Sequence, residues 1–121
     1  MKSILLLMGP NLNMLGEREP EIYGSDTLHE HVKEAKRVTN KFGYELQHYQ
    51  SNNEGDLVDQ IQNAREKHIG IIINPGALTH YGWSIHDALA AYEGVIIEMH
   101  LSNPNQREPW RHTSVVAPVA D

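Results

Sequence analysis

Two polar side chains, Glu98 and His100, stand at the end of an apolar run that includes Ile96 and Ile97. Residues two apart on a strand point to the same side, so the carboxylate can hold the imidazole in one tautomer or stabilise its protonated form. A carboxylate in such a run is costly to bury alone, so we expect His100 or an arginine to bond to it. The pair predicts a general acid.

Arginine and lysine are distributed differently along the chain. Arg18, Arg107 and Arg111 fall in predicted loops, whereas four of the five lysines fall in two predicted helices. Arginine offers forked donors to a carboxylate, and its charge lowers the pKa of a nearby phenol, for which Tyr23 is the candidate. Because no lysine is predicted near these residues, we expect an enolate held by hydrogen-bond donors rather than a Schiff base.

Other kinds of site are not supported. The chain has no glycine-rich nucleotide loop, Walker loop or serine nucleophile elbow. Its eight histidines lack metal-ligand spacing and cysteine is absent, so we predict no metal site, and the missing loops argue against a tightly held nucleotide. The net charge of −6 argues against nucleic acid or an anionic membrane as a partner, and no apolar run is long enough to span a bilayer. The absence of cysteine fits a cytoplasmic location.

The elements that must position these residues alternate along the chain. Short apolar runs predict strands at 4–8, 44–50, 71–73 and from 95, and helical spacing predicts helices at 28–42, about 54–67 and 85–92. Thr27 and Glu30 have capping-box spacing, and Gly43 is a C-terminal stop. The segments 11–26 and 74–82 are predicted loops. We therefore expect one α/β domain over residues 1–121, a doubly wound parallel sheet with helices on both faces.

In such sheets, ligands bind beyond the carboxyl ends of the strands, where strand order reverses. Each polar residue there also has an ordinary structural interpretation, such as turn formation, helix capping or packing. The candidates that follow the first, third and fourth strands are Asn11, Arg18, Tyr23, Asn74, Thr79, His80, Glu98, His100, Ser102, Arg107 and Arg111.

The apolar pattern fades after His100. Residues 106–112 predict one helical turn, and 114–121 predict no further apolar strand or helix. A doubly wound domain usually has at least five strands, so we expect a sheet edge and one apolar face to be left uncovered.

Four motifs follow one another along nearly the whole chain. They are Gly9-Pro10-Asn11-Leu12-Asn13-Met14-Leu15-Gly16; Arg18-Glu19-Pro20 with Ile22-Tyr23-Gly24; Asn74-Pro75-Gly76-Ala77-Leu78-Thr79-His80; and Glu98-Met99-His100-Leu101-Ser102-Asn103 with Arg107-Glu108 and Arg111-His112. In this order the motifs resemble those of type II 3-dehydroquinate dehydratases. The resemblance implies a flavodoxin-like fold, here without the family's usual final strand and helix, a homododecamer built as four trimers, and no cofactor. The implied reaction converts the anionic substrate 3-dehydroquinate to 3-dehydroshikimate in the shikimate or quinate pathways.

The same resemblance implies a role for each site residue. Tyr23 matches the phenolate base, favoured by Arg18 and Arg107, and His100 with Glu98 matches the general acid of an anti elimination. The loop from Asn13 to about Tyr23 matches a lid. Asn11 matches a residue that holds the water that stabilises the enolate. The matches for substrate binding are Asn74, the Leu101 backbone and Ser102, which bind the substrate carboxylate and its adjacent hydroxyl, and His80 and Arg111, which bind the other ring hydroxyls. Asp87 matches a residue that reaches in from a neighbouring subunit.

Two other interpretations stay open at this point. A noncatalytic flavodoxin-like binding or assembly module could keep the pocket without turnover. A receiver domain is disfavoured because the first and third strands end in Gly9 and Asn74 rather than in acidic residues. The chain departs from the commoner family spelling around Arg107, which predicts a shifted loop with both of its arginines retained. The departures are Asn103-Pro104-Asn105-Gln106 and Pro109-Trp110.

Overall fold

The computed structural model describes residues 2–17, 19–101 and 107–121, and only the backbone of Tyr23. Its sheet has the strand order β2-β1-β3-β4, and every neighbouring pair is parallel. The order reverses between β1 and β3, as in flavodoxin-like folds, which confirms the predicted doubly wound α/β architecture. The strands are β1 (Ser3–Met8), β2 (Glu45–Gln50), β3 (Gly70–Asn74) and β4 (Val95–Glu98).

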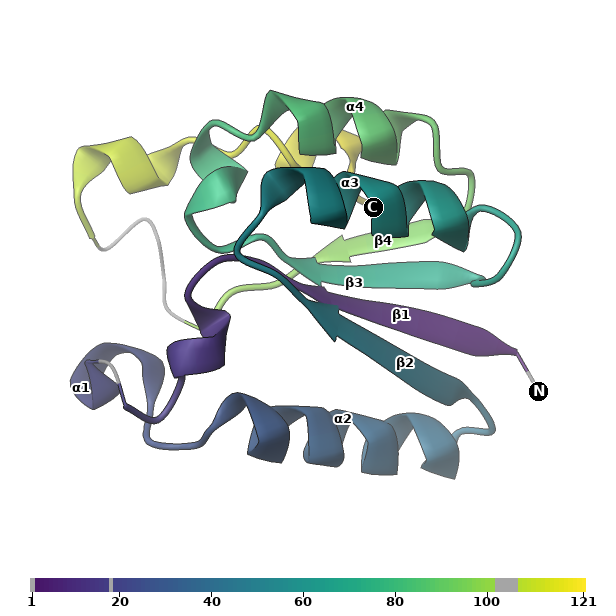
Figure 1. Ribbon diagram of the computed structural model, residues 1–121, viewed down its shortest axis with the longest axis horizontal. Helices are drawn as coiled ribbons and strands as arrows, with labels where there is room; N and C mark the ends of the chain where they lie inside the picture. Colours follow the sequence, from purple (N-terminus) through teal and green to yellow (C-terminus); the bar gives the residue numbers. More distant parts are fainter. Residues whose placement is uncertain (1, 18, 102–106) are drawn as a thin grey trace.

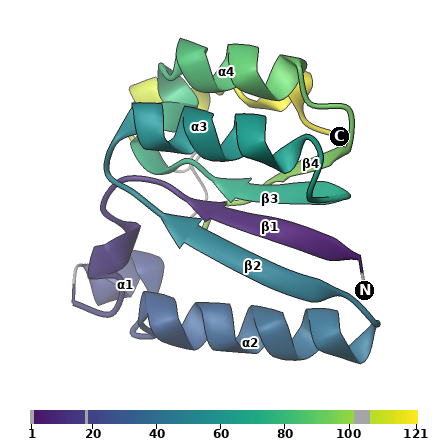
Figure 2. The same ribbon diagram turned by 45° about the vertical axis from the view of Figure 1, so that its right-hand side comes forward.

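Helices cover both faces of the sheet (Figures 1 and 2). Helix α2 (Leu28–Lys41) lies on one face, where Val32 packs with Leu6 and Leu46. Helices α3 (Glu54–Ala64) and α4 (Trp83–Ala90) lie on the other, and their buried side chains meet those of β1 and β3. Alternation along β1 explains both cores, since successive side chains on a strand point to opposite faces.

Local signals account for where the helices begin. Thr27 accepts the Glu30 N–H at 3.2 Å while the Glu30 carboxylate accepts the Thr27 N–H at 3.1 Å, so the predicted capping box is confirmed. Asn53 caps α3 through the Gly55 N–H. The prediction that α3 reaches about residue 67 is wrong, because it ends at Ala64, the last buried position of its apolar face.

The two predicted loops contain short helices that the sequence interpretation missed. They are η1 (Leu12–Met14) and α1 (Pro20–Tyr23) in the first, and η2 (Gly76–His80) in the second. Buried apolar residues explain two of these turns, since Leu12 contributes to the α2-side core and Leu78 to the opposite core. Pro20 supplies a φ that suits the first turn of α1.

The segment after Ser114 differs from the expectation that residues 114–121 form no further apolar strand or helix. Val115 and Val116 are buried in the α3/α4-side core, and a short helix η5 (Ala117–Val119) follows. The Asp121 N–H donates to the Ile96 carbonyl at 2.7 Å and the Asp121 carboxylate accepts the Ile96 N–H at 2.7 Å, so the segment lies beside β4.

The other face of β4 matches the expectation of an uncovered apolar surface. Val95 is 55% exposed and Ile97 is 45% exposed.

Two tight turns bring the ends of β1 and β3 together. Gly76 has a φ of 62°, and a side chain there would collide with the Pro10 carbonyl. A side chain at Gly9 would collide with the Pro75 backbone in the same way. Glycine is therefore required on both sides of this contact, which presses the loop after β1 against the loop after β3.

Candidate active site

The predicted acid pair is present at the carboxyl end of β4. His100 Nε2 lies 2.7 Å from Glu98 Oε2, and the two side chains are only 21% and 11% exposed. Since an ionised carboxylate only accepts, Nε2 is the donor and Nδ1 is the ring nitrogen left for other partners. The expectation that both residues lie on the strand is wrong, because β4 ends at Glu98. The contact itself is confirmed.

Glu98 has two further donors. The Thr79 hydroxyl contacts Oε2, and the Ser114 hydroxyl lies 3.0 Å from Oε1 and 3.1 Å from Oε2. Burial alone would raise the pKa of Glu98, but the hydrogen bonds from His100, Thr79 and Ser114 outweigh it and hold that pKa below its ordinary value. The carboxylate is therefore ionised and negatively charged at neutral pH.

A second group forms around Trp110 in the helix η4 (Pro109–His112), the described part of the turn predicted at 106–112. The His80 ring meets the Trp110 ring edge-on at 5.1 Å, and the Arg111 guanidinium lies 4.1 Å from the Trp110 ring centre. His80 Nδ1 is 2.6 Å from the Thr113 carbonyl, so Nδ1 carries the hydrogen and Nε2 is left for a ligand. Arg111 is also paired with Glu108.

Asn74 and Asn11 lie at the ends of neighbouring strands. Asn74 is 2% exposed, and its side-chain oxygen accepts the Gly76 N–H at 3.2 Å. Asn11 has a left-handed φ of 69°, and its N–H donates to the Asn52 side chain at 2.9 Å. The turn interpretation of Asn74 is therefore confirmed, and the site interpretation remains a prediction beside it.

The segment that carries Tyr23, the residue predicted to be the base, lies at the same end of the sheet. In Figure 1 the strands point toward the end where α1 and η1 lie, and α1 ends at Tyr23. The side chain of Tyr23, together with Arg18 and Ser102, lies outside what the structure describes. Leu101 packs on the α2-side core, and Arg107 precedes η4, where its carbonyl lies 3.3 Å from His112 Nε2.

Asp87 is not gathered with the other candidates. It is exposed on α4 and lines a surface hollow of about 610 Å³ between α3 and α4, together with Arg65 and Trp83. Within one chain, therefore, Asp87 belongs to the surface between α3 and α4 rather than to the group around Glu98 and His100. This placement leaves open the prediction that it serves a neighbouring subunit.

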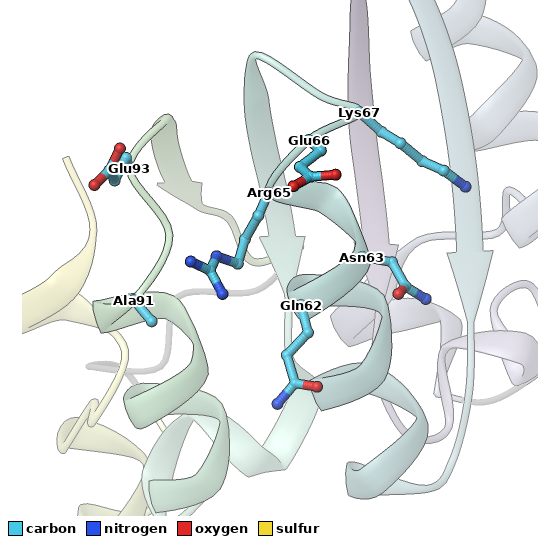
Figure 3. Close-up of a pocket in the computed structure, with 7 residues that line it drawn as sticks. All are labelled: Gln62, Asn63, Arg65, Glu66, Lys67, Ala91 and Glu93. Atoms are coloured by element: carbon cyan, nitrogen blue, oxygen red, sulfur yellow. The ribbon is translucent and has the colours of Figure 1, made fainter.

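Another hollow, of about 670 Å³, lies at the opposite end of the sheet. It is lined by the C-terminal residues of α3 and those that follow α3 and α4, including Arg65, Lys67 and Glu93. Figure 3 shows that these side chains point in different directions, with Lys67 directed away from Arg65. The hollow is mixed in charge and contains none of the predicted site residues.

Neither a metal centre nor a membrane span emerges from the described part of the chain. Over residues 2–17, 19–101 and 107–121, no group of three or more histidine, aspartate or glutamate side chains is placed to hold a metal ion. None of the helices in these ranges combines the length and apolar character needed to cross a membrane.

The sequence interpretation missed Ser114 and His86. Ser114 bonds to Glu98, and His86 Nδ1 contacts the Val115 carbonyl at 2.6 Å. The signal for Ser114 was a hydroxyl residue directly before the apolar pair Val115-Val116. Thr79 was named as a rim residue, but its link to Glu98 was not predicted, because residues so far apart in sequence give no spacing signal.

Comparisons with known proteins agree on one family. A family model described as dehydroquinase class II matches residues 2–121. The chain is 50% identical over 120 residues to a 3-dehydroquinate dehydratase of Bacillus licheniformis, covering 99% of this chain and 83% of that protein. It is 55% identical over 113 residues to a catabolic 3-dehydroquinase of Aspergillus clavatus, covering 93% and 75%. The crystal structure of the type II dehydroquinase from Butyrivibrio crossotus superimposes with a TM-score of 0.97 at 45% identity, covering 99% and 84%.

Proposed function

This chain belongs to the class II dehydroquinase family, and we propose that it is a hydro-lyase that converts 3-dehydroquinate to 3-dehydroshikimate. The observation that carries the proposal is the partly buried Glu98–His100 pair at the carboxyl end of the sheet, where a parallel fold binds its ligands. A noncatalytic module would have no need to maintain a partly buried carboxylate with three donors aimed at it.

We propose that Tyr23, as phenolate, removes a proton from the carbon beside the ketone. Arg18 and Arg107 favour the phenolate by their positive charge. The electron pair moves to the ketone oxygen as an enolate, which is stabilised by a water that Asn11 holds. The support is the family resemblance of these positions and the placement of α1 at the rim.

His100 then acts as the general acid. When protonated, the ring carries a hydrogen on both nitrogens, so Nδ1 delivers a proton to the departing hydroxyl while Nε2 stays bonded to Glu98. The hydroxyl leaves as water, and the enolate collapses to the conjugated ketone. The positions of the lysines support this route over an imine: Lys33, Lys36 and Lys41 lie in α2, while Lys2 and Lys67 lie at the amino end of the sheet.

Substrate binding is proposed for residues around the acid pair. His80 Nε2 and the Arg111 guanidinium are directed by their contacts with Trp110 and Thr113, which suits recognition of ring hydroxyls. The remaining proposed binders are Asn74, the Leu101 backbone, Ser102 and Arg107, with Asp87 contributed by a neighbouring subunit.

We also propose a homododecamer, a tetramer of trimers, that works in the cytoplasm. Large apolar side chains on the surface support assembly, since Trp83 is 62% exposed and Val95 and Ile97 are about half exposed. The absence of cysteine supports a reducing compartment.

The direct test is to incubate the protein with 3-dehydroquinate and follow the ultraviolet absorbance of the conjugated enone. We expect the absorbance to rise without added metal or cofactor. Treatment with borohydride during turnover should leave the protein mass unchanged, because no imine forms. A folded protein that gives no absorbance change would contradict the proposed reaction, and a reduced adduct on a lysine would contradict its mechanism.

A further inference from the structure

The carboxylate of Glu98 is held by hydroxyl groups that come from two distant parts of the chain. Thr79 lies in the short helix η2 after β3, and Ser114 opens the last segment, yet both hydroxyls contact the same carboxylate. Thr79 is 1% exposed, and its hydroxyl lies 3.0 Å from that of Ser114. Because both hydroxyls are at least partly buried beside an ionised carboxylate, we expect each to donate in a defined direction.

The direction of the Ser114 hydroxyl follows from its backbone partners. Its oxygen accepts the Val116 N–H at 3.2 Å and the Ala117 N–H at 2.9 Å, which occupies both lone pairs. The single hydrogen is therefore available for Glu98. Because Ser114 has no lone pair left for Thr79, the Thr79 hydrogen also goes to Glu98.

The two hydroxyls are fixed to one another by backbone bonds. The Val115 N–H donates to the Thr79 carbonyl at 2.6 Å, and His86 donates to the Val115 carbonyl at 2.6 Å. These bonds hold the backbone of Thr79 beside that of Val115, and so keep the two hydroxyl-bearing residues next to one another. The arrangement resembles the outer partners that orient a catalytic imidazole through its carboxylate.

We propose that Thr79 and Ser114 are positioning residues that aim the Glu98 carboxylate at His100, so that the last segment of the chain controls the general acid. This inference rests on the proposed function. Neither hydroxyl is assigned to substrate: they act through Glu98 and set the orientation of the His100 ring. With both donors removed, the carboxylate can rotate away, and the imidazole loses its defined tautomer.

The test uses Thr79→Val, which keeps the shape of the side chain and removes the hydroxyl, and Thr79→Ser, which keeps the hydroxyl. We expect Thr79→Val to lower kcat about tenfold with KM unchanged, because hydrogen bonds to charged groups have effects of this order. Thr79→Ser should restore kcat. Ser114→Ala should lower kcat similarly and Ser114→Thr restore it, and the double variant should fall less than the product of the two.

Thr39→Val is the matched control, since Thr39 in α2 uses its hydroxyl on the Ala35 carbonyl and lies outside the site. Its kcat should equal that of the parent protein. Equal losses of kcat in Thr79→Val and Thr79→Ser would indicate packing and overturn the proposal. A kcat near the parent value in both Thr79→Val and Ser114→Ala would overturn it as well.

Nitrogen-15 NMR of the His100 ring separates this proposal from the proposed reaction. We expect a hydrogen-bonded Nε2–H signal in the parent protein that shifts and exchanges faster with water in Thr79→Val and Ser114→Ala. An unchanged signal in both variants would overturn the positioning role even if the enzyme is active. A protein without activity whose ring signal responds as expected would instead contradict only the reaction.

Discussion

The two sides of the proposed site, the acid side around Glu98 and His100 and the base side from Asn11 to Tyr23, are built in different ways. On the acid side, Glu98 is 11% exposed and is bonded to side chains from three other points of the chain. On the base side, α1 is a helix of four residues whose turn is closed by backbone bonds such as that from Gly24 to Pro20. Its described residues from Glu19 to Ile22 are exposed.

The two sides differ in how much of their geometry the fold determines before substrate binds. The acid side is part of the core boundary, so its geometry is fixed when the sheet forms. The base side includes two non-glycine residues in the left-handed region, Asn11 and Glu19, with φ values of 69° and 41°. Such backbone is retained where the surroundings or a function require it. We therefore expect ligand binding to change the base side more than the acid side.

Tyr23→Phe should have the largest effect. The change removes the phenol proposed to be the base, so kcat should fall at least about a thousandfold, a loss of the size that general base catalysis provides. Binding of 3-dehydroquinate, measured by calorimetry, should persist. Near-normal turnover would show that the base lies elsewhere and would break the division between the two sides.

Glu98→Gln should have the next largest effect. The neutral amide cannot stabilise a protonated imidazole, so kcat should fall about a hundredfold. Glu93→Gln, at the opposite end of the sheet, is the matched control and should leave kcat unchanged. Equal kcat values in the two variants would mean that the Glu98 charge is not needed.

The same variant has a signature in stability. The pKa of Glu98 is below its usual 4.5 in the folded protein, so its ionisation stabilises the fold above that pH and the contribution is lost as pH falls through the lower folded value. Denaturation in urea between pH 3 and 7 measures it. The stability of Glu98→Gln should depend less on pH over this interval.

Trp110→Ala should affect binding more than chemistry. Trp110 contacts both His80 and Arg111 through its ring, and each such contact is worth about 1 kcal/mol. Removal of the ring should raise KM about tenfold with a smaller change in kcat. Trp110→Phe, which keeps an aromatic face, should restore most of the affinity. A loss confined to kcat would place Trp110 with the acid group instead.

The sequence was sufficient for the features that depend on local spacing or on motifs. The Thr27 capping box, the alternating strands and the Glu98–His100 pair are of this kind, and all three are present. The Thr79–Ser114 contact was not predictable, because it joins residues that are 35 positions apart in sequence and meet only in the folded chain. The burial of Val115 was not predictable for the same reason, because its core neighbours come together only in the folded chain.

Thr27→Ala should have the smallest effect and tests where the base side is anchored. Thr27 caps α2 through Glu30. Its methyl group lies beside Gly16, which has a φ of 87° and turns the chain after η1 back toward Thr27. Loss of the cap should lower the free energy of unfolding by about 1 kcal/mol, measured by urea denaturation. Thr27→Ser keeps the hydroxyl and should recover that stability. The base-side loop contacts Thr27 and the acid side does not. Any fall in kcat should therefore be accompanied by an unchanged NMR signal of the His100 ring. A changed signal would show that the two sides are coupled through the sheet.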